Sequence, residues 1–247
     1  MRGIIGGTGL THLANLEVSR REVVRTPYGE PSSAIVFGRI SDRDVVFLAR
    51  HGHGHTIPPQ AVNYRANLWA LHHVGVDRVV AVASVGGIAP GLTPGTVVVP
   101  DQIIDYTSGR HSTFFDGHDQ QVIHVDFTHP YTEALRAACR DAAEAAGIPI
   151  VWDGVYGAVS GPRLETAAEI GRMERDGSDM VGMTVMPEAA LARELRMQYA
   201  ALAVVSNYAA GRGDSTERIS HQQISAVLEP ALLRVRAIIE KWVENDD

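Results

Sequence analysis

The chain has 247 residues, of which 45% are hydrophobic and 21% charged, a composition typical of one globular α/β domain with an ordinary core. Its net charge, 22 − 29 = −7, argues against nucleic acid or an anionic membrane as the main partner, so donors for a small anion would have to be concentrated locally. Its single cysteine indicates a reducing cytoplasm, and neither a signal-peptide core nor a run of roughly 18 apolar residues is present.

The first strand is predicted at residues 3–5, and it leads into the glycine-rich turn GGTG at 6–9. This turn lacks the third glycine of a dinucleotide fingerprint and the Gly-Lys-Ser/Thr of a P-loop. A plain tight turn and an anion-binding turn that uses Thr8 therefore both stay open. Residues 22–49 are predicted to form antiparallel strands with a turn at 27–31.

The apolar run at 45–49 predicts a buried strand that ends in RHGHGH at 50–55. A cation and three imidazoles at the carboxyl end of a buried strand lie where an open α/β sheet binds its ligand. The two glycines let backbone amides approach an anion closely. We therefore expect an anion site rather than a polar surface loop, with Arg50 exposed at the strand end and adding little to packing.

A zinc site is the alternative for the same stretch, because alternating histidines can share one face of a strand. The glycines favour a loop instead, Arg50 would repel the ion, and no H-E-x-x-H motif or cysteine ligand follows. We expect no metal.

The remaining pattern alternates strands with helices, which predicts an α/β fold: a single domain over residues 1–247, with a mixed and largely parallel central sheet flanked by helices. A polar loop with two phenylalanines and several histidines spans 107–129, and such loops often carry function or cover a neighbour's site. Pro230 is expected to kink or divide the last helix, which Ser220 caps. Further strands are predicted at 78–84, 96–99, 102–104, 148–159, 179–184 and 199–205, and helices at 58–75, 131–146, 166–175, 187–194 and from 220.

Six predicted strands release polar residues or glycines at their carboxyl ends, which in a parallel sheet converge on one crevice. The set supplies anion donors, an acid, a thioether and an amide, but no Ser-His-Asp set and no nucleophilic cysteine. It suits a substrate that supplies its own nucleophile, such as phosphate. The six ends are Gly7-Thr8, Arg50–His55, Ser84–Gly87, Gly161–Glu165, Met183-Thr184 and Ser206-Asn207.

Five stretches together resemble the trimeric purine nucleoside and methylthioadenosine phosphorylases, and most closely the S-methyl-5′-thioinosine and 6-oxopurine branches of that family. The resemblance runs from residue 4 to about residue 228. It implies a homotrimer in which phosphate attacks the anomeric carbon of a purine nucleoside, with inversion and without a cofactor. The stretches are IIGGTGL at 4–10, RHGHGHTIPPQAVNYRANLWAL at 50–71, SVGGIAPGLTPG at 84–95, GPRLET at 161–166 and GMTVMPEAALARE at 182–194.

The resemblance also implies a role for each phosphate-site residue. Charge-assisted and amide donors would hold the phosphate and stabilise the cationic sugar. Relatives often carry Thr or Asn where this chain has Ala83, so a side-chain contact is lost there. Met183 would pack on the ribose. The implied phosphate ligands are Thr8, Arg50, His51, the backbone of Ala83 and Ser84, and Thr184, and the implied catalytic residues are Asn207, His51 and Arg50.

The purine end follows from the same resemblance. Methylthioadenosine phosphorylases carry Asp where this chain has Asn207 and Ala209. The Asn207 amide can instead donate to O6 and N7 of a 6-oxopurine, more strongly as negative charge grows on the leaving base. Glu165 matches the acid that accepts the N1 hydrogen. His221 would face the 5′ group, and His124 resembles a histidine that reaches in from a neighbouring subunit.

The sequence thus predicts phosphorolysis of S-methyl-5′-thioinosine, inosine or guanosine to the free purine and (methylthio)ribose 1-phosphate, in purine salvage. The expected partners are the nucleoside and phosphate, with neither nucleic acid nor a membrane. Three alternatives remain: an S-methyl-5′-thioadenosine phosphorylase, a nucleosidase that uses water, and a non-enzymatic purine or phosphate sensor.

Overall fold

The structure, a computed structural model, describes residues 1–10, 13–117 and 121–245, and at position 221 the backbone alone. No helix among these residues is long and apolar enough to cross a membrane. The strands are β1 (Arg2–Gly6), β2 (Glu17–Glu22), β3 (Ile35–Ile40), β4 (Arg43–Ala49), β5 (Arg78–Gly87), β6 (Val97–Val99), β7 (Gln102–Asp105), β8 (Val151–Trp152), β9 (Val155–Ala158), β10 (Met180–Gly182) and β11 (Gln198–Tyr208). The helices are η1 (Pro59–Ala61), α1 (Tyr64–His73), α2 (Glu133–Ala145), α3 (Ala167–Asp176), α4 (Val185–Glu194), η2 (Gly213–Ser215) and α5 (His221–Glu244).

The strands form one mixed, largely parallel sheet, which confirms the predicted fold class. Its main path runs β2-β3-β4-β1-β5-β10-β9-β7, and β5 also pairs along its length with β11, which continues to β6 and β8. The pairs β1–β4, β1–β5, β5–β11, β9–β10, β7–β9 and β6–β8 are parallel. The pairs β2–β3, β3–β4, β5–β10 and β6–β11 are antiparallel.

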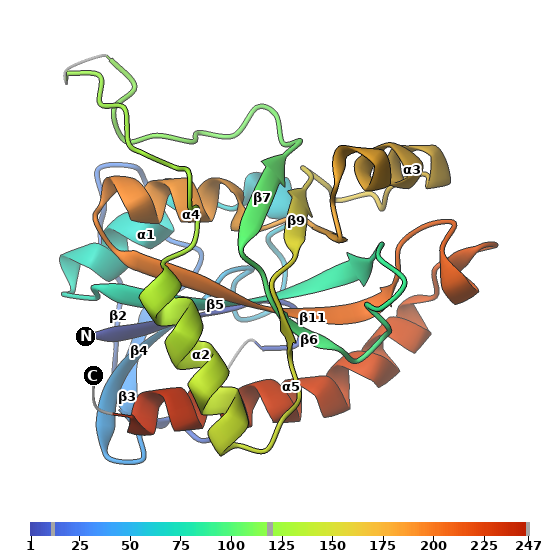
Figure 1. The fold of residues 1–247 in the computed structure, drawn as a ribbon. Coiled ribbons are helices and arrows are strands. Elements are labelled where there is room, and N and C mark those ends of the chain that lie inside the picture. Colours follow the sequence, from blue (N-terminus) through green and yellow to red (C-terminus); the bar gives the residue numbers. More distant parts are fainter. Residues whose placement is uncertain (11–12, 118–120, 246–247) are drawn as a thin grey trace.

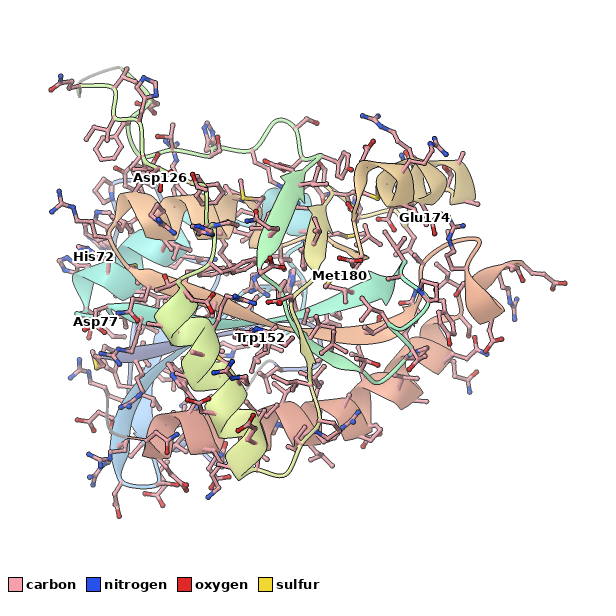
Figure 2. All side chains as sticks on the ribbon, in the orientation of Figure 1. His72, Asp77, Asp126, Trp152, Glu174 and Met180 are labelled. Atoms are coloured by element: carbon pink, nitrogen blue, oxygen red, sulfur yellow. The ribbon has the colours of Figure 1, made fainter. Side chains whose placement is uncertain are left out.

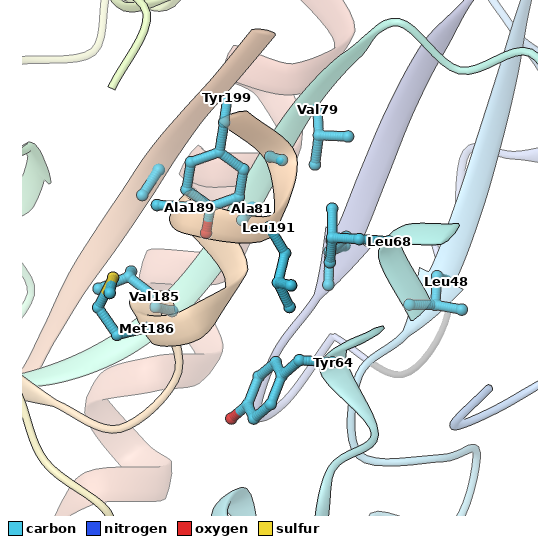
Figure 3. Close-up of a cluster of buried hydrophobic side chains, with 14 of the residues drawn as sticks. Leu48, Tyr64, Leu68, Val79, Ala81, Val185, Met186, Ala189, Leu191 and Tyr199 are labelled. Carbon is cyan, nitrogen blue, oxygen red and sulfur yellow. The ribbon is translucent and has the colours of Figure 1, made fainter. Parts of the chain in front are cut away.

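Helices cover both faces of this sheet: α1 and α4 lie on one side, and α2 and α5 lie on the other (Figure 1). Side chains alternate between the faces along each strand, so neighbouring residues join opposite clusters. Ile5 on β1 and Leu48 on β4 belong to the cluster under α1 and α4. Ile4 and Phe47, their chain neighbours, belong to the cluster under α2 and α5. Figure 3 shows the first cluster, with Leu191 of α4 facing the sheet.

Two predictions about these elements were wrong. The expected strand at 148–159 is two short strands, because Asp153 and Gly154 adopt positive φ values of 73° and 146° that interrupt an extended chain. Trp152, beside α2 in Figure 2, ends the first of them. Of the two outcomes predicted for Pro230, a kinked or a divided helix, division is wrong, because the last helix runs unbroken from 221 to 244. Burial of Leu228 and Leu232 against the sheet cluster offsets the backbone hydrogen bond that the proline removes.

Candidate active site

One cavity of about 410 Å³ lies at the carboxyl ends of the central strands. Residues from all six predicted strand ends line it, as the parallel pairing of β1, β4, β5 and β11 requires. Of the predicted site residues, the cavity brings together Thr8, Arg50, His51, Ala83, Ser84, Glu165, Met183, Thr184, Asn207 and Ala209.

Two predicted residues are not placed in this cavity. His124 is exposed and is not among the lining residues. The side chain of His221 lies outside the described part of the chain, so the structure leaves its predicted role open. Among the described residues, no group of three or more His, Cys, Asp or Glu side chains is arranged to hold a metal ion.

The turn after β1 approaches the neighbouring strands so closely that a side chain would not fit. A Cβ on Gly7 would lie 2.5 Å from the carbonyl oxygen of Val82 and 3.0 Å from Nη1 of Arg50. Gly7 therefore lets this turn lie against the strand end that carries Arg50. Next to it, Oγ1 of Thr8 lies 3.2 Å from Nε2 of His55.

Arg50 is fully buried, so the expectation of an exposed cation was wrong. Its Nε and Nη2 donate to the two carboxylate oxygens of Glu188 at 2.6 and 2.9 Å, and its Nη1 donates to the Val82 carbonyl at 2.8 Å. Tyr199 donates its hydroxyl to the same carboxylate at 2.8 Å. Burial alone would lower the pKa of Arg50, but the charge and hydrogen bonds of Glu188 raise that pKa above its ordinary value.

Glu188 is a functional neighbour that the sequence reasoning missed. It lies in α4 and is fully buried, between Pro187 and Ala189. A carboxylate in such an apolar stretch is the signal that could have pointed to it, because a buried acid needs a cation or several donors. The pair carries no net charge, yet Nη1 and Nη2 of Arg50 each retain one further N–H.

His51 is buried beside this pair and is held in one tautomer. Its Nδ1–H donates to the carbonyl of Ile57 at 2.8 Å. Burial, followed by the charge of Arg50, lowers the pKa of His51 from 6.5 to about 4. His51 is therefore neutral near pH 7, and its Nε2 is left as a hydrogen-bond acceptor.

Thr184 directly precedes α4, in which Met186 has extended dihedrals (φ −113°, ψ 131°), so the regular part of the helix begins only after Met186. The side chain is buried and lines the cavity, and the Tyr156 hydroxyl interacts with it. A hydroxyl can accept from such a neighbour and still donate to a ligand. Arg50, Thr184 and the turn at Thr8 thus offer donors at one end of the cavity.

Asn207 and Glu165 add an amide and a carboxylic acid to the cavity wall. Oδ1 of Asn207 accepts from the Ser206 hydroxyl at 2.7 Å, and Nδ2 donates to the Tyr208 carbonyl at 2.7 Å. The register of β11 against β5 shifts between Val205 and Asn207, and such irregularities redirect side chains at strand ends. One N–H of the amide stays available to a ligand. Burial is the main cause that raises the pKa of Glu165 above its usual range.

Ala209 lies at the cavity wall and is 1% exposed, packed with Val181 and Ile88. Two further apolar residues that the sequence reasoning did not single out, Ile219 and Ile224, also line the cavity. They occupy the positions before and four after the helix cap Ser220, the spacing of a hydrophobic staple. That spacing is the sequence feature that could have drawn attention to these two residues.

This fold and this cavity define an α/β nucleoside-phosphorylase architecture, and the chain belongs to the phosphorylase superfamily, whose family model matches residues 1–244. A relative from Pseudomonas syringae pv. tomato, named a probable S-methyl-5′-thioinosine phosphorylase, is 50% identical over 238 residues and covers 96% of each chain. A 6-oxopurine nucleoside phosphorylase from Pyrococcus furiosus is 47% identical over 231 residues, which are 92% of this chain and 85% of the relative. The methylthioadenosine phosphorylase of Schistosoma mansoni in complex with adenine superposes with a TM-score of 0.94 at 32% identity, over 98% of this chain and 90% of that one.

Proposed function

We propose that this chain is a purine nucleoside phosphorylase, a pentosyltransferase that cleaves a 6-oxopurine nucleoside with phosphate. The substrates are S-methyl-5′-thioinosine, inosine or guanosine, and the products are the free purine and (methylthio)ribose 1-phosphate. One observation carries the proposal: a single cavity holds buried anion donors around Arg50 and Thr184, and a fixed amide donor at Asn207. The names of the relatives, which act on 6-oxopurine nucleosides, support it.

The part of the cavity around Arg50 and Thr184 binds and orients phosphate, the nucleophile. Glu188 holds the guanidinium of Arg50 still, so its two unused N–H groups and the Thr184 hydroxyl bind phosphate oxygens without reorganising. A phosphate oxygen then forms a bond to the anomeric carbon while the bond to the purine nitrogen breaks. The bonding electrons pass to the base, and phosphate stabilises the cationic sugar between them.

The purine end selects the base. Turning the Asn207 amide over would place Oδ1 against the Tyr208 carbonyl, so the observed orientation, which presents an N–H to the ligand, is favoured. That N–H matches the acceptors O6 and N7 of a 6-oxopurine, and Glu165 matches the N1 hydrogen. A 6-amino purine presents hydrogens where this site donates, and should be disfavoured by about 10²-fold or more.

The 5′ group meets an apolar wall in this proposal. Ile219 and Ile224 line the cavity at the start of α5, the region where the resemblance places the 5′ group. Apolar side chains there favour a methylthio group over a hydroxyl, because an unpaired hydroxyl would cost about 1–3 kcal/mol. S-methyl-5′-thioinosine is therefore the preferred substrate of the three.

The test is a panel of inosine, guanosine, adenosine and their methylthio counterparts, each with and without phosphate. We expect base release that requires phosphate, with methylthioinosine cleaved at the highest kcat/KM. Release in water alone would identify a nucleosidase, and binding without turnover would identify a sensor. A preference for methylthioadenosine would overturn the assignment of the base while keeping the phosphorylase.

We further propose a single-domain, cytoplasmic homotrimer that needs no cofactor other than its co-substrate phosphate. Within the loop at 107–129, Phe114 is buried in the core, whereas Val122 and Ile123 are 58% and 48% exposed, on a part of the loop that stands out from the sheet in Figure 1. Two exposed apolar side chains beside His124 suit a contact with a neighbouring subunit, which supports the proposal that this loop reaches the neighbour's cavity. Light scattering with parallel activity measurements tests this, and an active monomer would refute it.

A further inference from the structure

Arg110 reaches from the loop after β7 to two separate segments of backbone. Its Nη1 donates to the carbonyl of Met183 at 2.8 Å and to that of Met186. Its Nη2 donates to the carbonyl of Ser160 at 2.9 Å and to that of Val159 at 3.4 Å. One guanidinium thus joins the segment after β9 to the segment that runs from the end of β10 into the start of α4.

The surroundings of Arg110 indicate a hydrogen-bonding role rather than an ion pair. Each of these hydrogen bonds goes to a backbone carbonyl. The guanidinium also lies over the ring of Tyr64, 5.1 Å from its centroid. A planar guanidinium with donors in fixed directions can hold several carbonyls at once, which the single ammonium of a lysine does less well.

Both segments continue directly into the cavity walls. Met183 and Thr184 form part of one wall, and Pro162, Leu164 and Glu165 form part of another. A peptide unit is planar and trans, so its N–H points opposite to its carbonyl. With the Met183 carbonyl turned to Arg110, the N–H of Thr184 is directed away from the guanidinium. Arg110, which is not among the lining residues, thereby fixes the orientation of groups that are.

We propose that Arg110 is a positioning residue for this reaction: it sets the distance and orientation between the wall that carries Thr184 and Met183 and the wall that carries Glu165. The inference rests on the proposed function, in which these walls hold phosphate and ribose on one side and the purine on the other. Without Arg110 the two segments separate, and substrate and nucleophile lose their alignment. Misplacement of about 1 Å can cost roughly a hundredfold in rate.

The experiment compares Arg110→Met and Arg110→Lys with a matched control, Arg234→Met. Arg234 also donates only to a backbone carbonyl among the described residues, that of Gly95 at 2.5 Å, and neither residue lines the cavity. The measurements are kcat, the KM for phosphate and for the nucleoside, and Tm. We expect Arg110→Met to lower kcat/KM for phosphate by about ten- to a hundredfold. Arg110→Lys should recover part of this loss, and Arg234→Met should leave both KM values unchanged.

The outcomes separate this inference from the proposed function. A wild type without phosphate-dependent turnover refutes the proposed function, and the inference falls with it. An active wild type with unchanged kinetic constants in Arg110→Met refutes positioning alone, even if Tm falls. If Arg110→Met does not fold, Arg110→Lys decides: unchanged constants overturn the inference, and a raised KM for phosphate at an unchanged Tm supports it.

Discussion

The buried pair of Arg50 and Glu188 makes a sharp prediction about stability. Among the residues that the structure describes, the carboxylate of Glu188 keeps only the Tyr199 hydroxyl as a donor in Arg50→Met, in a site that is fully buried. In Glu188→Leu the guanidinium keeps, within the same described part of the chain, only the Val82 carbonyl. Each single variant leaves one uncompensated buried charge, whereas the double variant Arg50→Met/Glu188→Leu leaves neither.

The expected magnitude follows from that burial. Removing one partner of a buried ion pair costs about 3–5 kcal/mol, whereas replacing both by apolar groups is often close to neutral. For a chain of this size a loss of 1 kcal/mol lowers Tm by roughly 2–4 °C, so each single variant should melt about 6–20 °C lower. The double variant should lose less than the sum of the two.

Equilibrium unfolding in urea at pH 7, followed by far-ultraviolet circular dichroism, measures these differences. Arg163→Met is the control, because Arg163 binds Glu169 through both nitrogens at 2.8 and 2.7 Å but at an exposed site. Exposed pairs contribute little, so its midpoint should change far less. Arg50→Met losing no more than Arg163→Met, or single losses that simply add in the double variant, would refute the reasoning.

Three further predictions concern individual residues. The pKa of His51 in the folded chain is about 4, below the 6.5 of the free side chain, so the unfolded chain binds a proton first as the pH falls. The free energy of unfolding should therefore decrease as the pH drops from about 6.5 to about 4. The urea midpoint plotted against pH should have a shallower slope in His51→Asn over that range. A Cβ on Gly182 would lie 1.9 Å from the Tyr156 hydroxyl oxygen and 2.6 Å from the ring carbon that bears it, so Gly182→Ala should lower Tm, and an unchanged Tm would argue against the clash. Thr166 caps α3 through a reciprocal pair with Glu169, so Thr166→Ala should cost about 1 kcal/mol in urea unfolding, and an unchanged midpoint would contradict the cap.

The sequence was sufficient for features that repeat along the chain. Apolar runs such as 45–49 and 78–84 are buried strands, and the rule for parallel strand ends identified residues that line one cavity. It was insufficient for features that depend on a partner across the fold. Periodicity does not show that Glu188 lies beneath Arg50, and therefore the burial of Arg50 was missed. Nor does it show the positive φ of Asp153, which comes from the local turn.

The double pairing of β5 has a consequence for the timescale on which the site moves. Its backbone is hydrogen-bonded to β1 on one edge and, along its length, to β11 on the other. Amide hydrogens in such a strand exchange with solvent only when most of the fold opens, whereas loop amides exchange through small local fluctuations. The strands β5 and β11, which carry Ser84 and Ser206, should therefore exchange slowly with or without ligand. Slowing of exchange on ligand binding should be concentrated in the loop segments that line the cavity, among them 159–165 and 183–184, while the strands beneath them change little.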